Sequence, residues 1–338
     1  MKNLYFTLCS SIALLSACSS GSGTDTTQSG NKLNNQVSQQ QLTTTHVFAN
    51  DAGNMGDINT AGTTLTAQTG LVSGMALDYD AHKTSTETAT FAISKGADGE
   101  AVMIVDGVTY NFVSGDRLSD GSGYNTTKNP DFNKLTDDLI YLTPYGGENL
   151  ASALDANNSN YLQVWEYGVD SPDATVAKHG FAVVGAQTAF ADVAGNAAAT
   201  YSGSAELKLV PVNGYSTQVL REILVRGELG MSVDFLSESI SGNLNSLSYT
   251  NGVGTSPSDL SGTVSLDATD INANGEFAGV MSPDQAFQQQ FGLDAEDKGS
   301  YSGGLFGPEA NQIGGTMGLT SSKFTGYGYF TADKDPAK

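Results

Sequence analysis

The stretch that decides the fold is Gly299-Ser-Tyr-Ser-Gly-Gly-Leu-Phe-Gly-Pro-Glu-Ala-Asn-Gln-Ile-Gly-Gly-Thr-Met317. It contains one strand-like run and begins a second, Ser300–Phe306 and Ile313–Leu319. Six further runs of this kind occur in the second half of the chain, at Thr200–Val210, Leu224–Phe235, Ser239–Tyr249, Ser261–Thr269, Gly275–Met281 and Phe324–Thr331. Eight antiparallel strands of this length suit a small closed barrel, whose interior side chains can fill and which exposes no strand edge. The sequence therefore predicts an eight-stranded β-barrel here.

A glycine that follows Ser, Thr or Ala recurs within or beside these strands. The repeated positions are Gly203, Gly242, Gly262, Gly279, Gly303 and Gly326. Glycine weakens a strand unless a bend, a bulge or a close backbone approach requires it, and a strongly curved barrel has many such places. The pattern thus supports closure. An outer-membrane barrel is the alternative, but the polar end Asp333–Lys338 favours a soluble barrel.

The first half of the chain also has mostly β character. Short runs of β-branched and aromatic residues, broken by Gly, Asn and Asp, predict strands at Thr88–Ile93, Ala101–Val105, Val108–Val113, Tyr161–Tyr167 and Gly180–Ala186. Asp106-Gly107 is a strong signal for a two-residue hairpin. Short connecting helices are expected at Asp137–Leu142, Gly147–Asp155 and Pro283–Phe291. The fold class predicted for the whole chain is all-β.

Residues 299–317 resemble the barrel signature of transferrin-binding protein B. The matching residues are Phe306, Gly307, Pro308, Glu309, Ala310, Gly314 and Gly315. Upstream, Gly180–Thr188 and Ala199–Gly203 are similar to that family's passage from its first subdomain into its barrel. The resemblance implies a handle-like β subdomain followed by a soluble eight-stranded barrel, in one lobe rather than two. It is specific for the fold and poor for the ligand, because partner contacts in such lobes come from variable loops.

The N-terminus has the features of a bacterial lipoprotein signal. Lys2 precedes a short apolar core, and Leu15-Ser-Ala-Cys18 forms a lipobox, so we expect cleavage before Cys18 and acyl chains on its thiol. A plain secretory signal that leaves Cys18 as a free thiol is the alternative. The expected organisation is a signal peptide at 1–17, a flexible tether at 18–44, a handle-like domain at 45–190 and a barrel domain at 191–338. Such a protein would be anchored by lipid in the outer membrane, at the cell surface of a Gram-negative bacterium.

Composition narrows the classes of function. The sequence has 36 Asp and Glu against 15 Lys and Arg, which opposes binding to nucleic acid, because that requires clustered positive charge. The only two cysteines are Cys9, inside the signal, and Cys18, so the mature protein cannot form an internal disulfide. Stability must then come from packing and hydrogen bonds.

Motifs for catalysis or metal binding are weak. His46, His82 and His179 lie far apart with no second ligand at a suitable spacing, so no zinc site is predicted, and a turn histidine is favoured for His179. Asp270-Ile-Asn-Ala-Asn-Gly275 resembles the start of a calcium loop, but Met281 stands where a bidentate Glu is required, and a hairpin turn explains the segment. With no nucleophile elbow or phosphate loop, we expect no enzyme.

Three aromatic residues are candidate partner contacts. Tyr124 and Tyr145 stand in loop-like surroundings, where packing does less to explain an aromatic side chain. Trp165 shares a strand face with Tyr161 and Tyr167, so core packing is favoured for it over a binding hot spot.

These features together predict a non-enzymatic outer-membrane surface lipoprotein that binds a host iron or haem carrier protein. The partner would be a protein such as transferrin or haemoglobin, with the cargo passed to a separate outer-membrane receptor. Two alternatives use the same scaffold: an adhesin or complement-regulator-binding lipoprotein, and a lobe that binds haem directly. Apart from haem, no cofactor is expected.

Overall fold

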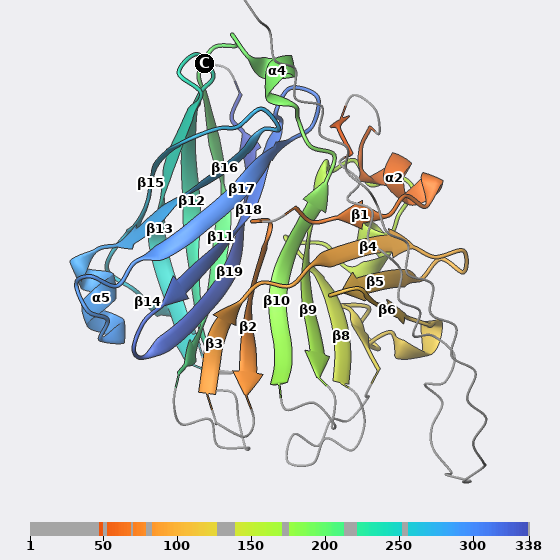
Figure 1. The fold of residues 1–338 in the computed structure, drawn as a ribbon, viewed down its shortest axis with the longest axis horizontal. Coiled ribbons are helices and arrows are strands. Elements are labelled where there is room, and N and C mark those ends of the chain that lie inside the picture. Colours follow the sequence, from red (N-terminus) through yellow and green to blue (C-terminus); the bar gives the residue numbers. More distant parts are fainter. Residues whose placement is uncertain are drawn as a thin grey trace, which may run out of the picture. The chain divides into compact units, whose positions relative to one another are not determined.

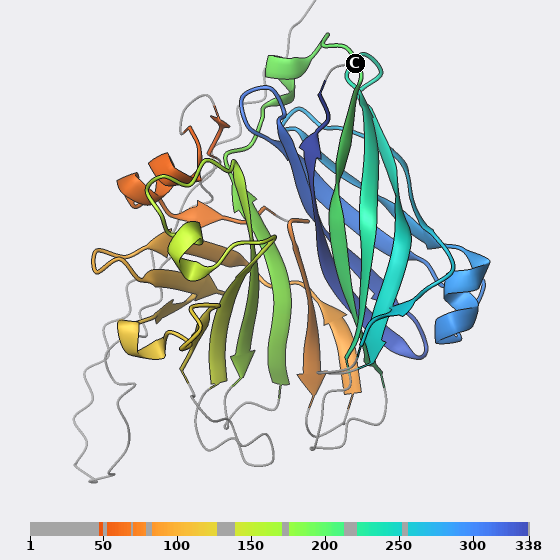
Figure 2. The same ribbon diagram turned by 180° about the vertical axis from the view of Figure 1, so that it is seen from behind.

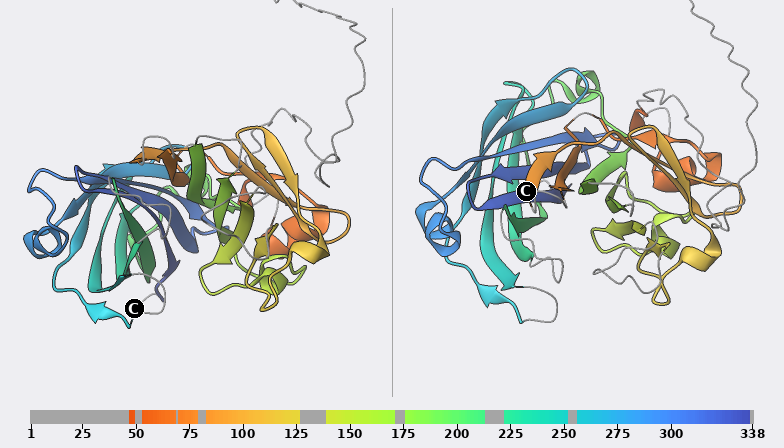
Figure 3. Two further views of the ribbon diagram at one scale, coloured as in Figure 1. Left: turned by 90° about the horizontal axis from the view of Figure 1, so that it is seen from below. Right: turned by 60° about the horizontal axis from the view of Figure 1, so that its bottom comes forward.

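Eight antiparallel strands close into a barrel in the second half of the chain (Figure 1). They are β11 (Ala199–Pro211), β12 (Ile223–Asp234), β13 (Ser239–Asn251), β15 (Val264–Asp270), β16 (Glu276–Pro283), β17 (Gly299–Phe306), β18 (Gln312–Thr320) and β19 (Phe324–Lys334). Each strand from β15 to β19 pairs with the next, β19 pairs with β11, and the pairings β11–β12, β12–β13 and β13–β15 complete the ring. Seen from below, the strands surround a common interior (Figure 3). The predicted all-β fold and eight-stranded barrel are confirmed.

The structure, a computed structural model, describes residues 47–49, 53–68, 70–78, 83–126, 139–170, 176–212, 222–251 and 256–336. These residues lie within one compact unit, Gln36–Lys338. The predicted signal peptide, Cys18, the tether, His46 and His82 fall outside the described residues. The domain boundaries at residues 45 and 190 stay a prediction.

Side chains that alternate along the strands fill the barrel. Leu207, Leu229 and Phe330 point inward from neighbouring strands and are almost completely buried, as is Tyr301 from β17. The period of two that places them inside sends the intervening residues outward. On β11 these outward residues include Glu206 and Lys208, which are nevertheless buried, because other strands cover that part of the barrel wall.

The covering strands come from the first half of the chain and form two sheets, called here the handle sheets (Figures 1 and 2). The four-stranded sheet has the order β1 (Leu65–Thr66), β4 (Phe91–Lys95), β5 (Ala101–Val105), β6 (Val108–Asn111). The six-stranded sheet has the order β3 (Lys83–Glu87), β2 (Val72–Asp78), β10 (Val176–Gly185), β9 (Leu162–Asp170), β8 (Leu139–Tyr145), β7 (Tyr124–Asn125). A two-residue strand, β14 (Ser258–Asp259), pairs with β13.

The handle sheets and the barrel wall share apolar packing. Tyr327 and Tyr329 on β19 belong to the same buried cluster as Phe181 on β10 and Trp165 on β9. Hydrogen bonds cross the same boundary: the Ser73 hydroxyl donates to the carbonyl oxygen of Gly328 at 2.8 Å. One side of the barrel is therefore interior to the protein.

The helices are short connectors: α2 (Met55–Ala61), the 3₁₀ turn η1 (Ser114–Asp116), α3 (Leu150–Ala153), α4 (Phe190–Val193) and α5 (Gln285–Phe291). The expected helix at Pro283–Phe291 is confirmed as α5, and its N-cap Asp284 accepts a hydrogen bond from the backbone of Phe287. The helix expected at Asp137–Leu142 is wrong, because residues 139–145 form β8, which pairs with β9. Only four residues of the segment expected at Gly147–Asp155 are helical.

Both predicted hairpin turns are present. At the β5–β6 turn, Asp106 and Gly107 have φ of 49° and 79°, the pair of positive values that a type I′ turn requires. Between β15 and β16, the Asn272 side chain accepts hydrogen bonds from the backbone of Asn274 and of Glu276. That segment is a hairpin turn closed by Gly275, with φ of 77°.

Candidate functional site

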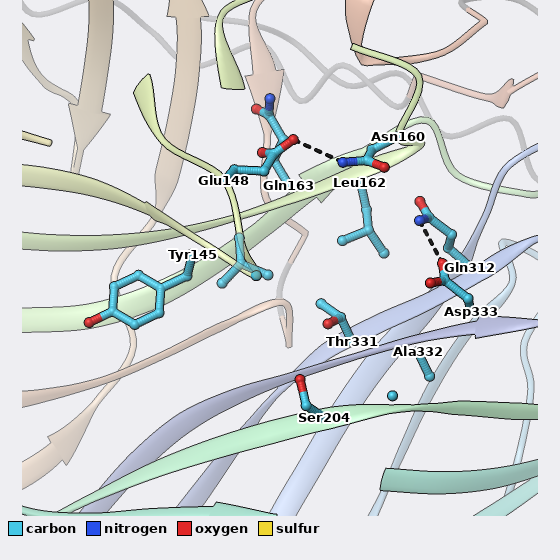
Figure 4. Close-up of a pocket in the computed structure, with 13 residues that line it drawn as sticks. Tyr145, Glu148, Asn160, Leu162, Gln163, Ser204, Gln312, Thr331, Ala332 and Asp333 are labelled. Carbon is cyan, nitrogen blue, oxygen red and sulfur yellow. Dashed lines mark hydrogen bonds between the residues drawn. The ribbon is translucent and has the colours of Figure 1, made fainter. Parts of the chain in front are cut away.

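Two adjoining cavities lie between the six-stranded handle sheet and the barrel wall, and together they are called the cleft. The smaller cavity has a volume of about 260 Å³ and lies among β9, β11, β18 and β19 (Figure 4). The larger has a volume of about 430 Å³ and lies beside Glu206, Arg226 and Tyr329 of the barrel. Tyr145, Gly146 and Glu148, where the chain leaves β8, line both cavities. The cleft is the candidate functional site.

Tyr145 forms an aromatic wall of the cleft. Its half-buried ring packs edge-on against Phe181 at 5.2 Å and against Tyr329 at 5.5 Å, measured between ring centroids. Burial, and then the nearby Glu166 carboxylate, raises the pKa of the Tyr145 phenol well above its usual value, so the ring keeps its proton. The side chain is held in place and presents a neutral hydroxyl.

Glu148 is fixed by two asparagines. Its Oε1 accepts hydrogen bonds from Asn158 at 2.8 Å and from Asn160 at 2.9 Å, and Figure 4 shows the second of these. Its buried Oε2 has no hydrogen-bond partner among the described residues. Burial raises the pKa of the Glu148 carboxyl, and the two amide donors offset part of that rise.

Glu206 contributes a second buried carboxyl from β11. Its side chain is 6% exposed, and its Oε2 accepts a hydrogen bond from Arg226 Nε at 2.9 Å. Its buried Oε1 has no partner within the described part of the chain. Burial raises the pKa of Glu206, although the Arg226 charge acts in the opposite direction.

A buried ion pair adjoins the cleft. The Lys208 ammonium lies 2.5 Å from Glu166 Oε1 and 3.6 Å from Glu222 Oε2, and it stands 5.5 Å from the centroid of the Phe181 ring. Desolvation lowers the pKa of Lys208, but the attraction of the two carboxylates outweighs it and the net shift is upward. The Lys208 ammonium is therefore already paired with the carboxylates of Glu166 and Glu222.

The structure places His179 beside this ion pair, within β10 rather than in the turn before a strand. Its Nδ1 lies 3.0 Å from the Tyr141 hydroxyl, which also donates to Glu166 Oε1 at 3.3 Å. Burial lowers the pKa of His179, so the imidazole is neutral at pH 7. The described residues contain no group of three His, Cys, Asp or Glu side chains that could hold a metal ion.

Of the three aromatic candidates, only Tyr145 lines the cleft. Trp165 is fully buried, and its Nε1 donates to Gln163 Oε1 at 3.1 Å. Tyr124 is also fully buried, stacks on Phe112, and donates its hydroxyl proton to Glu100 at 2.8 Å. Neither of these two side chains is accessible to a partner in this conformation.

Sequence reasoning missed the two glutamates that line the cleft, Glu148 and Glu206. Glu206 alternates with inward-facing leucines on β11, the pattern of a residue that faces solvent, and only the handle sheet buries it. Glu148 follows Gly146-Gly147, a turn signal that gives no indication of burial.

No described helix is long and apolar enough to cross a membrane.

No protein-family model matches the sequence, and no curated protein matches it either. Solved structures do match. The fold is similar to that of transferrin-binding protein B. The protein from serogroup B Neisseria meningitidis is 16% identical, with a TM-score of 0.39, and the match covers 79% of this chain and 44% of that one. The chain thus spans less than half the length of that structure.

Two further solved structures are matched over most of their own length. HpuA from Kingella denitrificans, in complex with human haemoglobin, is 15% identical with a TM-score of 0.37, covering 81% of this chain and 86% of that chain. The N-lobe of lactoferrin binding protein B from Moraxella bovis is 11% identical with a TM-score of 0.31, covering 57% of this chain and 79% of that chain.

Proposed function

We propose that this protein is a non-enzymatic outer-membrane surface lipoprotein that binds a host iron or haem carrier protein. In this proposal Cys18 carries the lipid, residues 18–44 form the tether, and the β fold is displayed to capture the carrier. The captured cargo then passes to a separate outer-membrane receptor. The lipobox at residues 15–18 supports the anchor, and the barrel supports display of a folded binding surface.

The observation that carries the proposal is the place of residues 299–317 in the fold. It builds the β17–β18 hairpin, and Phe306 and Ala310 are completely buried there. Gly307 and Ala310 form the turn with φ of 87° and 51°. Of the seven residues that match the transferrin-binding protein B signature, all but Pro308 and Glu309 are buried. Phe306 packs with the handle sheets and Ala310 with the barrel interior, so the buried residues of the signature have packing roles and are not candidates for partner contact.

The charge of the chain is consistent with capture of a protein surface. The formal net charge is −21, and the larger cavity of the cleft is lined by the carboxylates of Asp120, Glu148 and Glu206 as well as by the rings of Tyr145 and Tyr329. Such a field attracts basic patches on a partner and raises the rate of encounter. Tyr145 supplies the kind of rigid aromatic contact that is enriched at protein interfaces.

The proposal is tested with intact cells that display the full chain. Cells are incubated with fluorescent transferrin, haemoglobin or complement factor H, and retained label is measured after washing; cells carrying Cys18→Ala are the control. We expect cells that display the unaltered chain to retain transferrin or haemoglobin, and cells that carry Cys18→Ala to retain neither. Retention of factor H alone would favour the complement-regulator alternative, and no retention despite antibody-verified display would overturn capture of these carriers.

Direct haem binding is separated by a spectroscopic arm. Haem is titrated into the purified protein, and the Soret band is compared with that of free haem. Because the proposed partner is a carrier protein, no shift is expected. A saturable shift would instead support the lobe as a direct haem binder.

A further inference from the structure

The cleft has more negative than positive charge on its walls. Asp120, Glu148 and Glu206 line the larger cavity, and Arg226 is the one cation among the described residues that line it. Asp333 adds a carboxylate to the smaller cavity, where it accepts a hydrogen bond from Gln312 at 2.9 Å (Figure 4). The local field therefore favours a cation as occupant.

The second observation is independent of this count of charges. The Glu206 side chain is more than nine-tenths buried and lines the larger cavity, yet its Oε1 has no hydrogen-bond partner among the described residues. Glu148, at the junction of the two cavities, is a partly exposed side chain whose Oε2 atom is likewise buried without a partner among the described residues. Buried ionisable oxygens in folded proteins are nearly always satisfied, so two such atoms at one cleft indicate a missing donor.

No cation among the described residues supplies that donor. Arg226 Nε is engaged with the other oxygen of Glu206, Oε2. Lys208 faces Glu206 from the same strand, but its ammonium lies between Glu166 and Glu222. The amides of Asn158 and Asn160 both donate to Oε1 of Glu148, and neither reaches Oε2.

The remaining walls suit an organic cation rather than a metal ion. The rings of Tyr145 and Tyr329 stand at the larger cavity, and aromatic faces attract ammonium and guanidinium groups. A volume of about 430 Å³ is enough for a long side chain. The carboxylates do not converge as a three-ligand metal group in the described part of the chain.

We infer that the cleft receives an arginine or lysine side chain presented by a partner protein, with Glu148 and Glu206 as the anionic anchors. This inference rests on the proposed binding function and names the chemistry that the partner must offer. Free polyamines carry ammonium groups like that of lysine, so the test separates a side chain on a peptide backbone from a free amine.

The probe is the blocked peptide acetyl-Gly-Arg-Gly-amide, and its matched control has citrulline in place of arginine. Citrulline keeps the shape of the side chain but has a neutral urea group. Binding to the full chain is followed by NMR, using the backbone amides of Gly146, Gly203 and Ser204, which line the smaller cavity. The arginine peptide is expected to shift these signals with at least tenfold higher affinity than the citrulline peptide.

Variants test the anchors. The double variant Glu148→Gln/Glu206→Gln should weaken arginine-peptide binding at least tenfold. Glu296→Gln makes the same chemical change on an exposed residue that follows α5, and it should leave the affinity unchanged. The near-ultraviolet circular dichroism of each variant checks the fold, and the citrulline comparison on the unaltered chain remains decisive if the double variant does not fold.

Three results would overturn the inference: equal binding of the two peptides, unchanged binding by the folded double variant, or binding of spermidine but not of the arginine peptide. The experiment uses no host protein. Failure here would thus leave capture of a host carrier intact, and failure of capture would leave this peptide result intact.

Discussion

The ammonium of Lys208 lies 2.5 Å from the carboxylate of Glu166, and this contact joins the barrel wall to the six-stranded handle sheet. The two side chains are 10% and 8% exposed. A charged pair this deeply buried is costly to form and more costly to break, because the remaining charge stays buried without its partner. The pair therefore holds the handle sheet in one position on β11.

Replacing Lys208 should destabilise the protein strongly. Lys208→Met leaves Glu166 and Glu222 without their cation, and we expect a loss of about 3–5 kcal/mol in the free energy of unfolding. Urea denaturation measures it. Lys178→Met is the control, because Lys178 bridges Glu87 and Asp106 with a side chain that is 32% exposed, and it should cost less than about 1 kcal/mol. Equal losses for the two variants would contradict the role given to burial.

The raised pKa of Glu206 predicts a pH-dependent gain in stability for Glu206→Gln. Burial raises the folded-state pKa above the unfolded value; Arg226 and Lys208 offset part of that rise, and the Glu166 carboxylate adds to it. The native state then holds the proton more tightly, so this group's stabilising contribution is present below the unfolded pKa and is lost as pH rises through the folded pKa. Glutamine has no ionisable carboxyl, so Glu206→Gln removes this dependence of stability on pH.

The gain of Glu206→Gln over the unaltered chain should accordingly be larger at pH 7 than at pH 4, as measured by urea denaturation at both values. Glu296→Gln, on an exposed residue, provides the baseline for loss of one negative charge. A gain that is the same at both pH values would show that Glu206 is not strained in its ionised form.

Two turn glycines should differ in their tolerance of alanine. Gly107, with φ of 79°, has open space where a Cβ would stand, so Gly107→Ala should cost about 1–2 kcal/mol from the left-handed conformation alone. Gly275 has a similar φ, but a Cβ there would overlap the carbonyl oxygen of Thr188. Gly275→Ala should cost about 1–3 kcal/mol more, as in other overpacked sites. Thermal unfolding of both variants decides whether that close approach matters.

Membrane attachment should depend on Cys18 alone. Cys18→Ala removes the thiol on which we propose the acyl chains, and the chain should then move from the detergent phase to the aqueous phase in Triton X-114 partitioning. Incorporation of labelled palmitate gives an independent readout. Partitioning of Cys18→Ala with the detergent phase would show that another part of the chain holds the membrane.

The barrel could be predicted from the sequence because its strands alternate clearly. On β12 and β13 every inward residue is apolar or small, so the predicted bounds differ from the observed ones by only a few residues. The segment around residue 140 was harder. Its apolar residues Ile140 and Leu142 suit a strand as well as a helix, and only pairing with β9 decides between them.

Strands at the boundary between the sheets and the barrel escaped prediction for a physical reason. β2 is buried on both faces, since β19 packs across it, and it therefore shows no alternation. β3 has the polar sequence Lys-Thr-Ser-Thr-Glu, and its Thr84 forms a buried hydrogen bond to Thr325 of the barrel. Contacts between the handle sheet and the barrel also bury Glu206 and Lys208, which the alternation of residues along β11 would place in solvent. The cleft could therefore not be predicted from the sequence of its strands.

The position of β19 has a consequence for the order in which the protein can fold. It is synthesised after every other described strand, yet it closes the barrel against β11 and supplies Tyr327 and Tyr329 to the core beneath the handle sheets. Neither half of the chain can complete its packing until that strand has emerged from the ribosome. One strand therefore completes the barrel and the packing beneath the handle sheets together, which couples the folding of the two regions.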